Sequence, residues 1–165
     1  MIALQLAVSA PQCVRSLVIV NSGPELVVRS WRERLQIWQR KLILRILGMR
    51  KMGEVLSGRL FPKPEQAALR QGFTLRWAEN DPRAYREAFQ ALIGWSVVEH
   101  LGEIRCPVLI IASDADYTPI AQKEAYLARM VQAELVVIND ARHAVSVERP
   151  EAFNQAVLEF LAKRS

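Results

Sequence analysis

The stretch "CPVLIIASDADYTP", residues 106–119, decides the fold. It holds an uninterrupted aliphatic run, Val108 to Ile111, which closes in a polar turn. Such a run is typical of a strand that is buried on both faces of a parallel sheet. The same pattern occurs earlier at Leu17 to Val20, closed by Asn-Ser-Gly, and again at Leu135 to Ile138. We therefore expect three buried strands.

Helical patterns lie between and beside these strands. Residues 1–10 are apolar on nearly every side, which predicts a helix that is buried all round. Thr118 and Pro119 are typical N-cap and first-turn residues, and they predict a helix that runs to about Val131. Pro150 begins a last helix with apolar residues along one face. Strands that alternate with helices in this way predict an α/β fold with a parallel sheet.

Residues 25–96 have a different character, because they contain helical patterns and no strand pattern. An amphipathic helix with a basic opposite face is predicted by apolar residues at three- and four-residue steps, namely Trp31, Leu35, Trp38, Leu42, Ile46 and Met49. Two further helical stretches follow at about 65–80 and 82–94. The segment therefore reads as a helical insertion between two parts of one core, residues 1–24 and 97–165.

Length and composition limit the class of protein. A chain of 165 residues with 51% hydrophobic residues is long enough for one domain with a real core. It contains no apolar run of about 18 residues, so we expect no membrane span. The two cysteines and two histidines have no ligand spacing, so we expect no metal site. Two lone cysteines fit a reducing compartment, which favours a cytoplasmic protein.

The net charge of +5 is concentrated in one segment. Residues 29–59 contain nine Lys or Arg and only two acids. One hypothesis is therefore that this basic amphipathic segment binds an anionic membrane surface or nucleic acid. Against it, Trp31 and Trp38 fall on the stripe that a helix of a folded insertion must bury. We accordingly expect no nucleic-acid partner.

Polar residues follow two successive strands at their carboxyl ends. Asp114 and Asp116 come after the strand at 108–111, and His143 comes after the next one. The carboxyl ends of parallel strands meet at one edge of the sheet, where sites gather. A carboxylate there can fix the tautomer of an imidazole and stabilise the imidazolium that forms when the ring takes a proton. We predict a contact of about 2.6 to 3.2 Å between His143 and a carboxylate of this loop, and the residues alone leave open whether Asp114 or Asp116 makes it.

Each of these residues also has a purely structural interpretation. Asp114 could simply serve the turn, since aspartate is common in such loops. Asp116 could serve the turn as well, and His143 could be a structural histidine. His100 precedes the strand region and is taken as structural. Glu148 stands just before Pro150, where a carboxylate is favourable at the positive end of a helix.

The chain resembles the carboxyl-terminal part of an α/β-hydrolase of the esterase, lactonase and peroxidase-like group. The most specific stretches are "IRCPVLIIASDADYTP" (104–119) and "RHAVSVERPEAFNQAVLEFL" (142–161). In the second, His143, Glu148 and Pro150 stand as in the family pattern. "MIALQLAVSAPQCVRSLVIVNS" (1–22) resembles the helix and strand that follow the nucleophile elbow of the family.

The resemblance implies a partial hydrolase sheet with a helical cap over 25–96. It implies that His143 is the general base, that Asp116 orients it, and that Trp31 and Trp38 of the cap pack internally or line the pocket of a small ester-like substrate. No cofactor is implied. In the family the G-x-S-x-G turn would lie just before Met1, and no serine of this chain stands in that context. We therefore expect the nucleophile, whether Ser, Asp or Cys, to be missing.

Two expectations follow from a missing nucleophile. The chain alone should lack esterase activity, and the alternative function is a truncated, non-catalytic fragment or interaction module. The strand at 17–20 would also lack the neighbour that leads into the elbow. Its open edge would then favour self-association.

Overall fold

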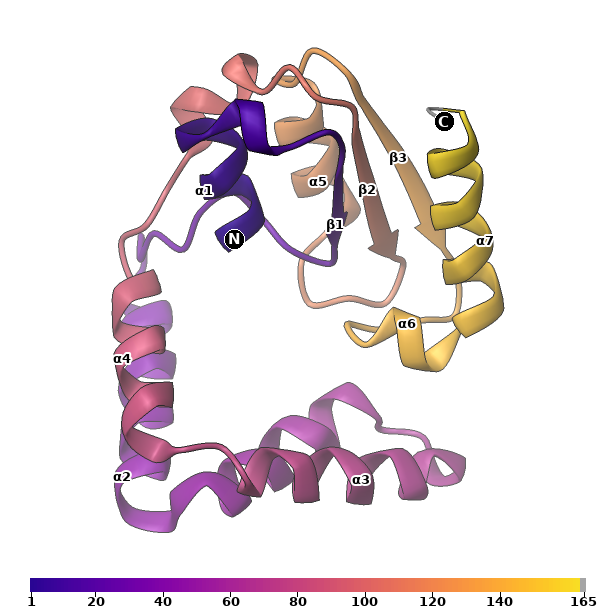
Figure 1. Cartoon of the computed structure of the whole chain (residues 1–165). Helices are drawn as coiled ribbons and strands as arrows, with labels where there is room; N and C mark the ends of the chain where they lie inside the picture. Colours follow the sequence, from indigo (N-terminus) through magenta and orange to yellow (C-terminus); the bar gives the residue numbers. More distant parts are fainter. Residues whose placement is uncertain (164–165) are drawn as a thin grey trace. The chain divides into compact units, whose positions relative to one another are not determined.

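The computed structural model describes residues 1–163, which divide into two compact units. The core unit comprises Met1–Glu25 and the chain from Ser96 onward. The helical unit comprises Leu26–Trp95. These limits differ by one residue from the boundaries that the change in sequence character suggests. The units are coloured along the chain in Figure 1.

A parallel three-stranded sheet forms the centre of the core unit (Figure 1). Its strands are β1 (Leu17–Val20), β2 (Val108–Ser113) and β3 (Ala133–Ile138), in the order β1-β2-β3. Every residue of the central strand β2 is buried. The three parallel strands are therefore confirmed, and β2 continues two residues further than its aliphatic run. Full burial is confirmed for β2 alone, because β1 alternates between buried and half-buried residues and only Ile138 is buried in β3.

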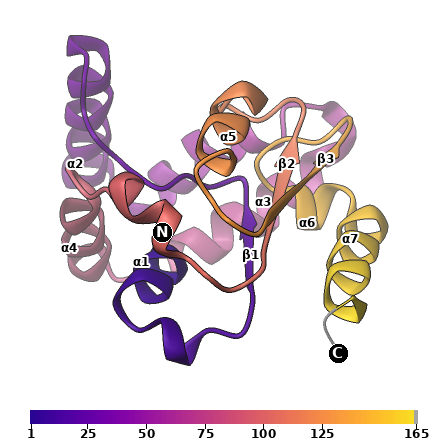
Figure 2. The same cartoon turned by 90° about the horizontal axis from the view of Figure 1, so that it is seen from above.

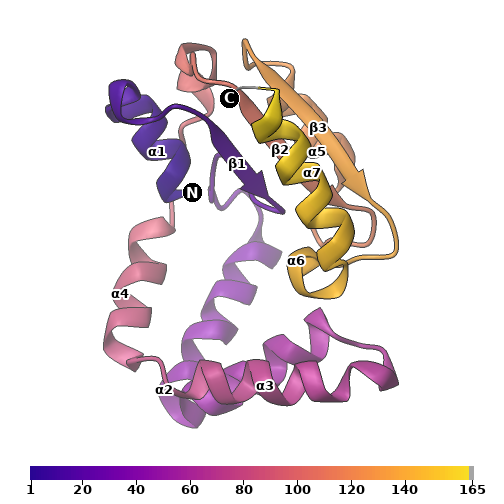
Figure 3. The ribbon, with the colours of Figure 1, turned by 45° about the vertical axis from the view of Figure 1, so that its right-hand side comes forward.

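Helices cover both faces of this sheet. They are α1 (Ile2–Ser9), α5 (Ile120–Leu127), the short α6 (Val145–Glu148) and α7 (Pro150–Ala162). Figure 3 shows α7 on one face and α5 behind the other. An apolar cluster lies between α7 and this face of the sheet. It is made of Leu109, Ile111, Ile138, Ala141, Val145, Ala156 and Phe160.

Two helices of the core unit differ from the sequence prediction. In α1 only the face with Leu4 and Ala7 is buried, whereas Ile2 is 84% exposed, so the expected all-round burial is wrong. The helix covers the sheet from one side only. α5 begins at Ile120, and Thr118 does not cap it because its hydroxyl donates to Asp116 instead. None of the described helices is both long and apolar enough to cross a membrane.

The helical unit consists of α2 (Trp31–Leu60), α3 (Ala67–Ala78) and α4 (Pro82–Leu92). The short turn Pro64–Gln66 joins α2 to α3. Figure 2 shows α2 and α4 side by side. A capping box of Ser30 and Glu33 starts α2. Gly48 then interrupts its regular helical geometry with a φ of 73°, a conformation that glycine adopts without steric cost.

The interior of the helical unit lies around the second half of α2. Leu44, Met49 and Met52 are buried there. A continuous run of ring contacts extends this interior along α3 and α4, through Phe61, Phe73, Trp77, Tyr85 and Phe89. The three helices therefore share one small core.

The apolar stripe on the first half of α2 is exposed, contrary to expectation. Trp31 is 69% exposed and Trp38 is 58% exposed, and Leu35, Leu42 and Ile46 are exposed as well. Arg40 of the opposite face packs instead. The Arg40 guanidinium lies 4.6 Å from the ring centre of Phe89 in α4, and its Nε donates to the Tyr85 hydroxyl at 2.6 Å. The expectation that this stripe is buried is therefore wrong from Trp31 to Ile46, whereas Met49 at its end is buried.

Candidate active site

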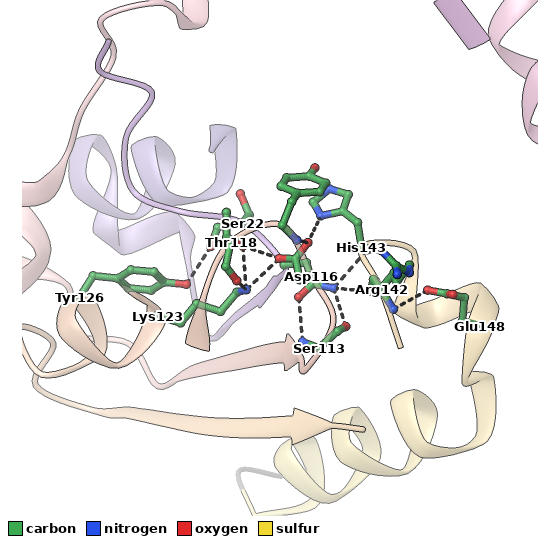
Figure 4. Close-up of polar contacts among 11 residues, drawn as sticks. Ser22, Ser113, Asp116, Thr118, Lys123, Tyr126, Arg142, His143 and Glu148 are labelled. Atoms are coloured by element: carbon green, nitrogen blue, oxygen red, sulfur yellow. Dashed lines mark hydrogen bonds and ion pairs between the residues drawn. The ribbon is translucent and has the colours of Figure 1, made fainter. Parts of the chain in front are cut away.

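Asp116 and His143 meet above the carboxyl ends of two neighbouring strands (Figure 4). Asp116 lies in the loop between β2 and α5, and His143 lies in the loop between β3 and α6. The His143 Nδ1 atom is 3.0 Å from Asp116 Oδ1. This is the contact that the sequence predicts. Its catalytic role stays a prediction.

The Asp116 carboxylate is completely enclosed and uses both of its oxygens. Its side chain is 0% exposed. Oδ1 also accepts from the Tyr117 backbone N–H at 2.9 Å. Oδ2 accepts from the Lys123 ammonium at 2.8 Å and from the Thr118 hydroxyl. Burial opposes ionisation of the carboxyl group, but the hydrogen bonds from His143, Lys123 and Thr118 outweigh it and hold the pKa of Asp116 well below its ordinary value. Asp116 is therefore a carboxylate at neutral pH.

His143 is held on one side and open on the other. Its side chain is 34% exposed, and the Tyr117 ring stacks on the imidazole with ring centres 4.3 Å apart. Among the described residues none hydrogen-bonds Nε2. With Nδ1–H donated to Asp116, an assignment made from the hydrogen-bond pattern, Nε2 keeps its lone pair free to accept a proton.

A buried asparagine ties the three loops of the site together. The Asn21 amide nitrogen donates to Ser113 Oγ at 2.7 Å and to the backbone carbonyls of Arg142 and His143 at 3.0 and 3.2 Å. Asn21 Oδ1 accepts from the Ser113 backbone N–H at 3.0 Å. The residue has a φ of 42°, a left-handed conformation that asparagine tolerates better than most residues. It therefore fixes the loop that carries His143 against the ends of β1 and β2.

Asp114 and Glu148 also hold the histidine loop, although neither contacts the imidazole. Asp114 Oδ1 accepts from the Ala141 backbone N–H at 3.2 Å. Backbone N–H groups, first that of Asp140, lower the pKa of Asp114. Glu148 Oε2 accepts from the Arg142 backbone N–H at 2.7 Å, so this carboxylate holds the loop before α6, and its role at the start of α7 stays a prediction.

The remaining candidates lie elsewhere in their units. His100 pairs with Glu103 at 2.9 Å in the short turn Val98–Glu103, which agrees with a structural role. Trp31 and Trp38 lie on the exposed stripe of α2. Both cysteines are free, and the described residues contain no group of three or more His, Cys, Asp or Glu that could hold a metal.

Sequence reasoning missed Lys123, Asn21, Tyr117 and the site role of Thr118. Asn21 is 92 residues from Ser113 and 122 residues from His143, so no local pattern links them. Lys123 gave one weak signal, since it is a lysine in a helix that packs on a buried strand. A charge at such a position requires a buried partner.

Comparison with known proteins shows the same architecture. The enol-lactonase structure from Burkholderia xenovorans LB400 superposes with a TM-score of 0.84 over 97% of this chain, at 19% identity, and the chain covers 61% of that protein. An esterase from Thermogutta terrifontis superposes with a TM-score of 0.83 over 99% of the chain, at 20% identity, with 62% of the esterase covered. At these identities the likeness shows the fold alone.

Sequence relatives extend over the whole chain. It is 29% identical over 177 aligned positions to a Stutzerimonas stutzeri protein named "Putative carbamate hydrolase RutD", covering 99% of the chain and 63% of the relative. It is 26% identical to 3-oxoadipate enol-lactonase 2 of Acinetobacter baylyi, covering 92% of the chain and 56% of the relative. The chain thus spans about 60% of the length of these relatives. A model of the "Alpha/beta hydrolase family" matches residues 1–156, and the chain therefore belongs to that family.

Proposed function

We propose that this chain carries the acid and the base of a hydrolase that cleaves an ester, lactone or similar carbonyl substrate by acyl transfer. The observation that carries the proposal is the 3.0 Å contact between Asp116 and His143, with Nε2 open on the far side of the ring. Relatives named as a carbamate hydrolase and as an enol-lactonase support the hydrolase class.

In the proposed reaction His143 Nε2 takes a proton from the nucleophile as that group attacks the carbonyl carbon. The ring then becomes an imidazolium, which the Asp116 carboxylate stabilises through Nδ1–H. Nε2 next returns the proton to the leaving group, and a water molecule repeats the cycle to release the acyl group. Asp116 stays ionised throughout, which the lowered pKa of this carboxyl supports.

The nucleophile and the oxyanion donors are proposed to come from a segment upstream of Met1. No serine in the sequence stands in a G-x-S-x-G context. A base and its orienting acid cannot replace these groups, so the chain by itself should not turn over. The alternative of a non-catalytic fragment agrees with the same absence.

The helical unit is proposed as the cap that selects the substrate. Trp31 and Trp38 support this role because they are exposed. Exposed tryptophans on one helical stripe offer an apolar surface for the acyl part of a small substrate. The expected cytoplasmic location also stays a prediction.

The test is to join the chain to the segment of the Stutzerimonas relative that this chain does not cover, where the proposal places the nucleophile turn. Hydrolysis of p-nitrophenyl acetate is measured for the chain alone, for the extended protein and for the extended protein with the nucleophile changed to Ala. We expect turnover only in the unmodified extended protein. Activity of the purified chain alone, or a folded extended protein without activity, would contradict the proposal.

A further inference from the structure

A lysine is buried beneath the proposed catalytic pair. The Lys123 side chain is 1% exposed, and it forms a buried ion pair with Asp116, whose side chain is 0% exposed. Its Nζ donates to Asp116 Oδ2 at 2.8 Å, to the Thr118 carbonyl at 2.8 Å and to Thr118 Oγ1 at 2.7 Å. An ammonium has three protons, so all of its donors are satisfied.

This lysine solves an electrostatic problem at the site. A carboxylate with a fully buried side chain takes up a proton unless a positive charge or several donors compensate it. His143 cannot supply a permanent charge, because a general base must be neutral before it acts. A protonated Asp116 could not stabilise the imidazolium that forms later. A positive charge that is present before the base acts must therefore come from another residue, in addition to the neutral donors.

The other groups that face Asp116 carry no positive charge. Thr118 and Tyr117 in its own loop contribute a hydroxyl and a backbone N–H. Tyr126 of α5 donates its hydroxyl to the Ser22 carbonyl at 2.7 Å. Burial, and secondly the charge of Asp116, raise the pKa of Tyr126, so it remains neutral. Only Lys123 brings a full charge to the carboxylate among the described contacts.

Lys123 also affects which Asp116 oxygen contacts the His143 imidazole. It binds Oδ2 together with Thr118, while Oδ1 is left for His143 (Figure 4). A carboxylate that is anchored through one oxygen cannot rotate away from the ring. The hydrogen bond to Nδ1 therefore keeps its direction, and with it the tautomer that leaves Nε2 free.

We propose that Lys123 is a positioning residue: its ammonium keeps the buried Asp116 ionised and turns Oδ1 toward His143. The catalytic meaning of this inference rests on the proposed function. The ionisation of Asp116 and the tautomer of His143 are properties of the chain itself, however, and they can be measured without any turnover.

The test compares the unmodified chain with Lys123→Met, which removes the charge and keeps most of the length. Selective ¹³C labelling of aspartate follows Asp116 during an acid titration, and ¹⁵N spectra report the His143 tautomer. We expect the pKa of Asp116 to rise by at least about one unit in Lys123→Met, and the single Nδ1–H tautomer to become a mixture. The control is Lys51→Met, whose ammonium pairs with Glu54 at 2.8 Å on the surface and should leave Asp116 unchanged.

A second variant covers the case in which Lys123→Met does not fold. Removing one partner of a buried pair leaves an uncompensated charge, whereas removing both does not. Asp116→Asn combined with Lys123→Met should therefore fold when the single variant does not. The proposal is overturned if Asp116 titrates identically in Lys123→Met and in the unmodified chain, or if the double variant is as unfolded as the single one. Neither outcome depends on esterase activity, so failure here differs from failure of the proposed function.

Discussion

At the scale of single residues, the site depends on how one carboxylate shares its two oxygens. Asp116 gives Oδ1 to His143 and Oδ2 to Lys123, and its side chain has no exposure to water. Asp114, two residues earlier, is exposed and binds a backbone N–H of the next loop. The two aspartates therefore have different tasks in spite of their closeness in sequence.

This difference predicts unequal effects of two matched substitutions in the extended, active protein. Asp116→Asn should lower kcat by roughly 10⁴, because an amide at this position favours the wrong imidazole tautomer. Asp114→Asn keeps an oxygen for the Ala141 N–H and should change kcat by less than about tenfold. Steady-state hydrolysis of p-nitrophenyl acetate measures both. The opposite order of severity would make Asp114 the acid.

The sequence could predict Asp116 and His143 because both follow strands, and parallel strands bring their carboxyl ends together. It could not predict Lys123, because the contact depends on where α5 begins. Thr118 looks like an N-cap, but its hydroxyl binds Asp116 and the helix starts later, at Ile120. This hydrogen bond within the loop outweighs the capping preference of Thr118.

At the scale of elements, periodicity finds the residues that share a helical face but does not show which face is covered. Trp31 to Ile46 of the α2 stripe are exposed, and the opposite face with Arg40 and Leu44 packs in the helical unit. Met49, which the pattern places on the same stripe, lies beyond the break at Gly48 and is buried. Likewise α1 is apolar all round, but only its face with Leu4 and Ala7 is buried. Burial depends on the neighbouring elements, which a helical pattern does not contain.

The packing of α2 on α3 predicts a large effect at one glycine. A Cβ on Gly53 would lie 2.8 Å from the Trp77 Cβ and 3.2 Å from the Thr74 carbonyl oxygen. Gly53→Ala should therefore lower the free energy of unfolding by about 1–3 kcal/mol. Gly58→Ala in the same helix is the control, because nothing lies within 4 Å of its Cβ position and alanine favours helix by up to about 1 kcal/mol. Urea unfolding measures the free energy of unfolding of both variants. Equal values for Gly53→Ala and Gly58→Ala would contradict close packing of α2 on α3 at Gly53.

Because Trp38 lies on the exposed stripe of α2, its substitution should weaken substrate binding and leave the stability of the fold nearly unchanged. In the extended protein, Trp38→Ala should raise KM for p-nitrophenyl esters with longer acyl chains by about tenfold, since a ring of this size contributes 1–3 kcal/mol of apolar contact. The melting temperature should change little, because the ring is 58% exposed. Leu75→Ala, an exposed apolar residue of α3, is the control. Equal KM values in the unmodified extended protein, Trp38→Ala and Leu75→Ala would contradict the proposal that Trp38 contacts the substrate.

At the scale of the whole molecule, the sheet determines how the chain behaves in isolation. β1 pairs with β2 on one side only among the described residues, although its residues are of the buried, aliphatic type. The fold of the core unit could be predicted because alternating strands and helices leave few topologies. Its self-association could only be proposed, because one chain shows an open edge but not what covers it.

The open edge predicts that the isolated chain is oligomeric or aggregating. Unpaired N–H and C=O groups of β1, beside the exposed Ile2 and Leu6 of α1, form a template for a second strand. Size-exclusion chromatography with light scattering should give a mass above that of one chain, and Ile2→Lys should lower it. A monodisperse monomer with a cooperative melt would contradict this expectation.

The central claim is that His143, oriented by Asp116, is the base of a hydrolase. The most direct measurement is kcat/KM for p-nitrophenyl acetate in the extended protein with and without His143→Ala, with His100→Ala as the matched control. The account predicts a loss of at least about 10⁴ for His143→Ala and less than about twofold for His100→Ala, which pairs only with Glu103 among the described contacts. If the extended protein hydrolyses the ester equally well without His143, the proposed mechanism is wrong.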